Sequence, residues 1–449
     1  MIARPTKMAF AIALATSLGA CDSLDHPMLP PTGQVLLYVD TDAIVPLAPT
    51  EPAEETTPTP IFDRLRIEMI EPGADAPCKD CTREFPVDRR LFKTGGASVG
   101  LLPRVGVAGY RARLTLYRTF RSEIAGPRSV SSLVSVITLP SIAAEGIVTV
   151  HTVLRTDDLG TSHGTLEAPI PFTAGAPPAS LVDTWAREQR VSCAEVPGEG
   201  EVCVPGAAYW QGDLTANQPS EQLVAISPFY LDATEVTVKR IRASAVGQSG
   251  VANGDVKLQL LSTNAKLCTY TDAPGANEDR PVNCVRRAFA QKFCEAAGGR
   301  LPTEAEYQFA ASGRVGSAFV WGDDLPACAD AIFGRNEDMS LQAARSCVAA
   351  GVGAANVATG ARDVLVLRTG RVFDLNGNVA EWAFDDYVAP TDPCRAALIS
   401  IDPVCTATPK LPTFRGGAWN VGGGDLRAVG RGKLDAVGTD LGFRCARGK

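Results

Sequence analysis

The sequence predicts two domains of different architecture: an all-β sandwich over residues 34–155, then a domain of irregular chain with short helices over residues 193–449. The chain has 449 residues, a length that predicts two or three domains with sizeable cores. Apolar and polar residues alternate in the first part, and no helical period persists there. From about residue 193 the chain becomes glycine-rich, contains tryptophan and loses this alternation.

The composition excludes several classes of protein. The formal net charge is −7 and 45% of the residues are hydrophobic, so the chain is neither disordered nor a basic nucleic-acid binder. Aromatic residues make up 6%, which argues against a stacking platform for single strands. After residue 24 no stretch of about 18 apolar residues occurs, so no second membrane span is expected.

The first residues read as an export signal. Arg4 and Lys7 precede an apolar run over 8–18, and the run Leu18-Gly19-Ala20-Cys21 resembles a bacterial lipobox. This resemblance implies a lipoprotein signal peptide at 1–20, diacylglycerol on Cys21 and a tether over 21–33. The alternative is an ordinary secretory signal with an incidental cysteine. We expect an exported bacterial lipoprotein on the periplasmic or outer-membrane face, which contacts the membrane through its lipid anchor only.

The remaining cysteines suit an oxidising compartment. The chain has 13 cysteines, and removing Cys21 leaves twelve, an even number. Cys78-x-x-Cys81 is half of a zinc motif, but no second pair with nearby histidine accompanies it. A local disulfide is the better interpretation of this pair.

Alternation of apolar and polar residues predicts strands across the first domain. The predicted strands lie at 34–39, 62–70, 110–117, 133–139 and 147–154. His151 and His163 are isolated, which favours structural roles over metal binding. Residues 156–192 lack periodicity and contain Gly175-Ala176-Pro177-Pro178, which is typical of a linker.

Three short helices are predicted in the second domain. The first follows the capping residue Thr237 to about residue 245, and the second is an amphipathic segment over 285–297 that ends at two glycines. Thr303 and Glu306 form a capping box that starts the third, which ends near residue 312. Glu304 and Glu306 therefore have a structural explanation and are not predicted to be catalytic acids.

A series of motifs in the second domain resembles one family. The motifs, in chain order, are Val204-Pro205-Gly206, Ser227-Pro228-Phe229 with Glu235-Val236-Thr237, Gly299-Arg300-Leu301-Pro302-Thr303-Glu304-Ala305-Glu306, Trp321-Gly322, Asp374-Leu375-Asn376-Gly377-Asn378-Val379-Ala380-Glu381-Trp382, Arg415-Gly416-Gly417-Ala418-Trp419 and Leu441-Gly442-Phe443-Arg444-Cys445. Residues from about 197 to 449 thus resemble the sulfatase-modifying-factor or formylglycine-generating-enzyme-like domain. The resemblance implies an α+β, C-type-lectin-like formylglycine-generating-enzyme fold with little regular secondary structure.

The same resemblance also indicates what is missing. The family's named activity is oxidation of a substrate cysteine to formylglycine, with copper held by two cysteines between the Gly-Gly-x-Trp and Leu-Gly-Phe-Arg motifs. Here that interval, 420–440, contains no cysteine. A related branch holds iron with histidines, but no histidine follows His163. No copper or iron is therefore expected.

Two functions remain open at this stage. The sequence favours a non-catalytic domain that binds a protein, peptide or glycan of the envelope, or that has a structural role there. No nucleic-acid partner is expected. The alternative is a formylglycine-generating-type oxidoreductase that acts on protein cysteine with a non-standard active site.

The resemblance implies one calcium site. The side chains of Asp374 and Glu381 and the carbonyls of Gly377 and Val379 are its expected ligands, because hard oxygen ligands suit Ca²⁺. The alternative is a turn held by local hydrogen bonds, with a partly buried glutamate.

Six disulfides are expected. The family resemblance pairs Cys294 with Cys445. Nearness in sequence then suggests the other five pairs, which are Cys78–Cys81, Cys193–Cys203, Cys268–Cys284, Cys328–Cys347 and Cys394–Cys405.

Overall fold

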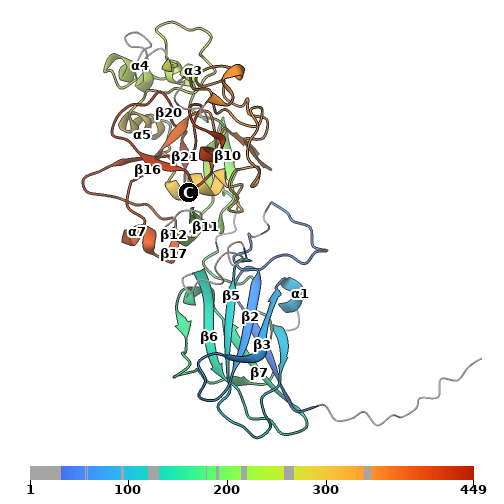
Figure 1. Cartoon of the computed structure of the whole chain (residues 1–449). Coiled ribbons are helices and arrows are strands. Elements are labelled where there is room, and N and C mark those ends of the chain that lie inside the picture. Colours follow the sequence, from blue (N-terminus) through green and yellow to red (C-terminus); the bar gives the residue numbers. More distant parts are fainter. Residues whose placement is uncertain are drawn as a thin grey trace, which may run out of the picture.

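A computed structural model describes residues 32–55, 57, 59–92, 96–119, 131–177, 179–188, 192–213, 220–256, 267–337 and 345–448. The signal peptide predicted at 1–20, Cys21 and most of the tether at 21–33 lie outside these residues. Two domains follow one another along the chain (Figure 1). No helix among the described residues has the length and apolar character needed to cross a membrane.

Two mixed sheets form the N-terminal domain. In spatial order the first consists of β4 (Ala97–Leu101), β1 (Gln34–Thr41), β7 (Ile147–Leu154) and β9 (Thr173–Ala174). The second consists of β3 (Pro77–Pro86), β2 (Arg64–Ile70), β5 (Arg111–Tyr117), β6 (Ser132–Thr138) and β8 (Ser162–His163), and a short helix α1 (Arg89–Phe92) follows β3.

Apolar and polar residues alternate along these strands, and their side chains are alternately buried and partly exposed. Along β2, Leu65, Ile67 and Met69 are buried, whereas Arg64 and Arg66 are partly exposed. Side chains from both sheets join one hydrophobic core, which includes the following residues: Val35, Leu37, Leu65, Ile67, Leu114, Leu116, Leu133 and Val150. The predicted strand positions therefore coincide with strands that share a core.

Residues 156–192 do not form the linker that their composition indicates. This segment adds the 3-10 turn η3 (Thr156–Asp158), β8 beside β6 and β9 beside β7 to the N-terminal domain. Its Trp185 is 4% exposed, joins the core and donates a hydrogen bond from its indole N–H to Asp157 at 2.9 Å. Burial of the large Trp185 ring stabilises the packing of this segment against the two sheets, although its sequence has no periodicity.

The C-terminal domain combines four small sheets with a few short helices among its described residues. The sheets, in spatial order, are β10 (Glu201–Val204), β13 (Phe229–Asp232) and β21 (Ala446–Arg447); β11 (Ala207–Asp213), β12 (Ser220–Ile226) and β17 (Ile399–Ile401); β14 (Val364–Leu367) and β15 (Gly370–Phe373); and β19 (Arg431–Lys433), β18 (Pro412–Arg415), β16 (Ala380–Asp386) and β20 (Leu441–Gly442). The helices are α3 (Val238–Ala243), α4 (Ala245–Ala252), α5 (Arg287–Ala296), α6 (Glu304–Ala311) and α7 (Pro393–Ala396), with the 3-10 turns η6 (Val348–Ala350) and η7 (Gly423–Leu426).

Capping signals in the sequence start helices where they were predicted. The Thr237 side chain accepts the Arg240 backbone N–H at the start of α3. At the start of α6, Thr303 accepts the Glu306 N–H at 3.1 Å, and the Glu306 carboxylate accepts the Thr303 N–H at 2.8 Å. Glu306 also pairs with Arg300 at 2.7 Å, which completes a structural role for this residue.

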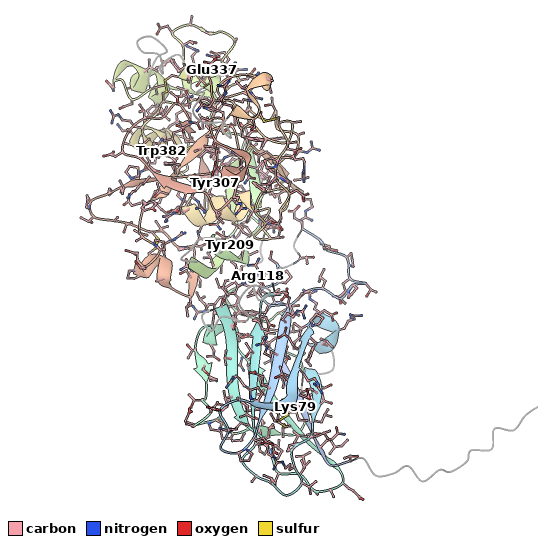
Figure 2. All side chains as sticks on the ribbon, in the orientation of Figure 1. Lys79, Arg118, Tyr209, Tyr307, Glu337 and Trp382 are labelled. Atoms are coloured by element: carbon pink, nitrogen blue, oxygen red, sulfur yellow. A yellow bond between two sulfur atoms is a disulfide. The ribbon has the colours of Figure 1, made fainter. Side chains whose placement is uncertain are left out.

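The two domains pack against each other. Trp210 on β11 donates its indole N–H to the Ile61 carbonyl at 3.0 Å, and its ring meets Phe62 edge-on with centroids 6.0 Å apart. Arg314 donates to the Glu55 carbonyl at 3.1 Å. Figure 2 shows side chains between the two domains, near the label of Arg118. The core of the N-terminal domain thus continues into the sheet β11–β12–β17.

Six disulfides hold the loops. Their pairs are Cys78–Cys81, Cys193–Cys203, Cys268–Cys284, Cys294–Cys445, Cys328–Cys347 and Cys394–Cys405, the same pairs that the sequence suggests. The bridge from Cys294 to Cys445 connects residues 151 positions apart and joins α5 to the C-terminal end of the chain. Every cysteine after Cys21 is therefore in a disulfide.

Candidate functional site

The loop over 374–381 connects β15 to β16 in the interior of the C-terminal domain. The Asp363 carboxylate, which is fully buried, accepts the backbone N–H groups of Leu375, Asn376 and Gly377 at 2.8–3.1 Å. Asp374 and Asn378 adopt positive φ angles of 55° and 68°. Asp363 thus fixes an unusual backbone turn by satisfying its donors.

A second buried acid, Glu235, holds the other end of this loop. Its carboxylate accepts the side-chain amide of Asn378 at 2.9 Å and the Val379 backbone N–H at 3.0 Å. Glu235 belongs to the Glu235-Val236-Thr237 motif noted in the sequence, but no local pattern there predicts a contact with residues more than 140 positions away. Asp363 lies in no motif, and it was not predicted either.

Glu381 forms a fully buried ion pair with Arg444. The Arg444 Nε donates to both carboxylate oxygens at 2.9 and 2.8 Å, and Nη2 donates to Oε1 at 2.7 Å. Both side chains are fully buried. Arg444 also donates to the carbonyls of Asp232, Phe373 and Asp374, so it links the loop to β13 and β15.

The loop gathers more negative charge than this arginine balances. Glu235, Asp363, Asp374 and Glu381 are all buried, and Arg444 pairs with only one of them. Burial, followed by the charge of Asp363, raises the pKa of Asp374 to about 7. Burial likewise raises the pKa of Asp363 to about 6, and it raises that of Glu381 although Arg444 opposes the shift. Such a site favours either bound protons or a bound cation.

Two features of Asp374, one of the expected calcium ligands, suit a cation. Asp374 is 1% exposed, and its Oδ1 has no hydrogen-bond partner among the described residues, while Oδ2 accepts the Ala358 N–H. An unpaired buried carboxylate oxygen is costly unless a ligand satisfies it. The described parts of the chain contain no group of three or more His, Cys, Asp or Glu residues arranged to hold a metal. The site would therefore depend on Asp374, Glu381 and backbone carbonyls.

The interval 420–440, where the family's copper cysteines would lie, is built from other residues. Leu426, in η7, is fully buried against Phe319 and Phe333. The Asn420 side-chain amide donates to the Asp440 carboxylate at 3.0 Å, so a hydrogen bond joins the two ends of the interval. Thiolates are the ligands that hold Cu(I), and the interval contains none.

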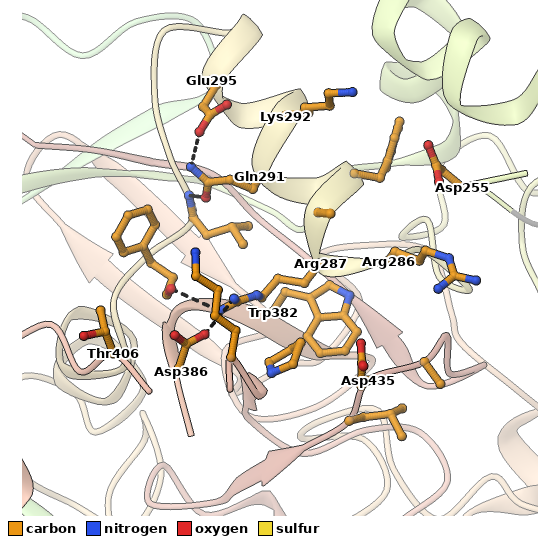
Figure 3. Close-up of a pocket in the computed structure, with 18 residues that line it drawn as sticks. Asp255, Arg286, Arg287, Gln291, Lys292, Glu295, Trp382, Asp386, Thr406 and Asp435 are labelled. Carbon is orange, nitrogen blue, oxygen red and sulfur yellow. Dashed lines mark hydrogen bonds and ion pairs between the residues drawn. The ribbon is translucent and has the colours of Figure 1, made fainter. Parts of the chain in front are cut away.

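A pocket of about 840 Å³ lies beside α5 and β16 (Figure 3). Phe289, Leu301 and Trp382 contribute apolar surface to it. Arg287 crosses it and pairs with Asp386 at 2.7 Å. The other charged residues that line it are Asp255, Arg286, Lys292, Glu295, Lys410 and Asp435, so both signs are mixed. This mixture offers surface for a polar partner but no assembled set of catalytic groups.

Comparisons with known proteins find several similar chains. The formylglycine-generating enzyme of Streptomyces coelicolor is 29% identical over 161 residues, which cover 28% of this chain and 51% of that enzyme. The chain thus spans about half the length of this curated relative. PvdO from Pseudomonas aeruginosa is a similar solved structure, with a TM-score of 0.41 and 19% identity over 59% of this chain and 100% of that chain. Treponema denticola variable protein 1 gives a TM-score of 0.40 and 18% identity over 55% of this chain and 94% of that chain.

The family model of the sulfatase-modifying factor enzyme 1-like domain matches residues 187–449. The match covers the sheets, the loop over 374–381 and the interval 420–440. Because it spans more than half of the chain, this protein belongs to the sulfatase-modifying factor enzyme 1-like domain family.

Proposed function

We propose that this protein is a lipid-anchored component of the bacterial cell envelope whose C-terminal domain binds a ligand without catalysing a reaction. The ligand would be a protein, peptide or glycan of the envelope. The observation that carries the proposal is the absence of any cysteine from the interval 420–440, together with the capture of every cysteine after Cys21 in a disulfide. A sulfur atom in a disulfide is not a thiolate, so the family's copper chemistry has no ligands here.

The envelope location rests on the sequence and the disulfides. The run up to Cys21 resembles a lipoprotein export signal, which supports an anchored chain, and six disulfides suit an oxidising compartment. The disulfides and the buried acidic loop would hold a C-type-lectin-like scaffold rigid, so that exposed loops present a defined surface. Such a scaffold suits recognition.

We predict no formylglycine formation on a Cys-x-Pro-x-Arg peptide, with or without added copper, because the thiolate pair is missing. Mass spectrometry of the peptide after incubation measures the outcome, and a formylglycine-generating enzyme serves as the positive control. Conversion well above a sample without enzyme would reject the non-catalytic proposal and favour an oxidoreductase with a non-standard active site.

We also propose that Ca²⁺ occupies the loop over 374–381. Asp374 supplies an unpaired buried oxygen, and Glu381 keeps lone pairs beyond those that Arg444 uses. The carbonyls of Gly377 and Val379 accept no hydrogen bond from the described loops or side chains. A hard cation would satisfy these oxygens and offset the excess negative charge of the loop.

Chelation of calcium is expected to lower the melting temperature of the full chain. A ligand that binds only the native state stabilises it by about 2.7 kcal/mol at a concentration one hundred times its Kd. Asp374→Ala is expected to remove this sensitivity. Asp42→Asn, a change at a buried aspartate of the N-terminal domain, should retain it. Identical melting curves with and without chelator would favour a turn held by hydrogen bonds alone.

A further inference from the structure

A second pocket, of about 530 Å³, lies where β18 and β19 meet α7 and η7. Helix α7 runs beside β12 and β17 (Figure 1). Four of the lining residues are arginines: Arg395, Arg415, Arg427 and Arg431. Asp425 also lines the pocket, and its carboxylate accepts the Gly422 N–H at 3.3 Å. A pocket of this size accommodates a small organic group.

Glu304 is the shared counter-ion of three of these arginines. Its fully buried carboxylate accepts hydrogen bonds from Arg431 at 2.6 and 2.9 Å, while Arg415 and Arg395 lie 3.7 and 3.9 Å away. Burial would raise the pKa of Glu304, but the three guanidinium groups outweigh burial and hold the pKa below its ordinary value. Glu304 therefore stays ionised and cancels one of three positive charges.

The neighbouring charges leave an excess of positive charge. Asp385, the other buried acid nearby, accepts the Glu304 backbone N–H at 2.8 Å. Three arginines against Glu304 and Asp385 leave one net positive charge. Arg427 and Asp425, which both line the pocket, oppose each other in sign, and Lys433 adds a cation at its edge.

Arg395 is the most loosely paired of the three arginines. Its side chain is 8% exposed, and its guanidinium donates no hydrogen bond to any residue that the structure describes. At 3.9 Å its ion pair with Glu304 is longer than a hydrogen bond. Nearby, the fully buried Arg415 Nε also lacks a partner among the described residues. A buried donor without an acceptor costs free energy. The Arg395 guanidinium lines the pocket, where a ligand oxygen can serve as its acceptor.

The backbone of α7 places Arg395 firmly. Asp392 caps the helix by accepting the Cys394 N–H at 2.9 Å, and Pro393 occupies the first turn. The disulfide from Cys394 to Cys405 fastens the helix to the chain that leads into β18. A cation on a fixed helix is preorganised for a ligand, so binding orders little of the protein.

We propose that this pocket binds its ligand through a single carboxylate group, which Arg395 recognises. The excess positive charge favours an anion, and the planar guanidinium fork matches the two oxygens of a carboxylate. Tyr387, Pro390 and Phe414 also line the pocket and provide surface for the rest of the ligand. This inference rests on the proposed ligand-binding function and gives it a chemical class.

Titration of the detergent-solubilised full chain tests the proposal. The probes are N-acetyl-L-glutamate α-amide and galacturonate, which each carry one carboxylate and represent an acidic residue and an acidic sugar. N-acetyl-L-glutamine amide and galactose, which carry no carboxylate, are their controls, and calorimetry measures the Kd of each. We expect binding of at least one carboxylate and of neither control, and weaker binding at high salt. Binding of all four probes alike, of none, or of inorganic phosphate in preference would overturn the assignment.

Variants separate recognition from a structural role. Arg395→Gln is expected to raise the Kd of the carboxylate probe at least tenfold, whereas Arg286→Gln, at the pocket of Figure 3, should leave it unchanged. Without ligand, Arg395→Gln should melt only slightly lower than the parent chain, because Arg431 and Arg415 still face the Glu304 carboxylate. Unchanged affinity in Arg395→Gln would reject Arg395 as the recognition residue. Formylglycine assays on the same samples report separately on the non-catalytic proposal.

Discussion

Replacing Arg444 with alanine is expected to lower the free energy of unfolding by about 3–5 kcal/mol, because it leaves the fully buried Glu381 carboxylate without its cation. The change also removes donors from the carbonyls of Asp232 and Phe373. A loss of this size is a large fraction of the stability of a typical domain. Urea unfolding of the full chain, followed by circular dichroism, measures the loss.

Arg447 provides a matched control three residues further along the chain. It pairs with Glu195 and Glu201 at 2.8 Å, but its side chain is 27% exposed. Solvent screens such pairs, so Arg447→Ala is expected to cost at most about 1 kcal/mol. If Arg444→Ala and Arg447→Ala unfolded at the same urea concentration, the buried pair would contribute no more than a surface pair.

Local signals in the sequence predicted local structure well. The Thr303–Glu306 capping box starts α6 at the expected place, because both of its hydrogen bonds lie within four residues. Alternation predicted β2 and β5 because one face of each strand is buried. The segment 156–192 was predicted wrongly as a linker, since the partners of Trp185 lie on strands far away in sequence.

Contacts between residues far apart in the sequence could not be predicted from these local patterns. The Asp363 carboxylate supports the loop over 374–381 by accepting backbone N–H groups of the loop. Almost any residue type can donate a backbone N–H, so the sequence of the loop does not indicate this contact. Arg395 stands on a four-residue helix with no motif around it. Its chemistry follows only from Glu304 and Arg415, which lie close to it in the folded domain.

The family motifs were informative for a different reason. Glu381 and Arg444 belong to separate motifs, and the structure brings them together as one buried pair. The resemblance identified both motifs, but the sequence did not show that Glu381 pairs with Arg444. Because Glu381 already pairs with Arg444, the variant that tests calcium binding is Asp374→Ala. The Asp374 Oδ1 has no hydrogen-bond partner in the described chain.

Removal of the Cys294–Cys445 disulfide is expected to destabilise the chain by about 5 kcal/mol. The bridge joins residues 151 positions apart, and constraint of the unfolded chain grows with the length of the closed loop. Both cysteines are buried and join the core around Phe289, Phe293 and Phe443. Cys294→Ala/Cys445→Ala should therefore unfold at a much lower urea concentration than the parent chain.

The pair Cys78–Cys81 gives the matched comparison, because it closes a loop of only three positions. The same chain-entropy argument gives less than about 2 kcal/mol for Cys78→Ala/Cys81→Ala. Mass spectrometry of a digest made without reduction identifies the bridges that are present in the exported protein. A free thiol at Cys294 or Cys445 in that protein would contradict the pairing, and an equal loss of stability in the two double variants would contradict the dependence on loop length. A large loss confined to Cys294→Ala/Cys445→Ala would show that this bridge, which ties α5 to the chain's C-terminal end, limits the unfolding of a domain whose regular sheets are small.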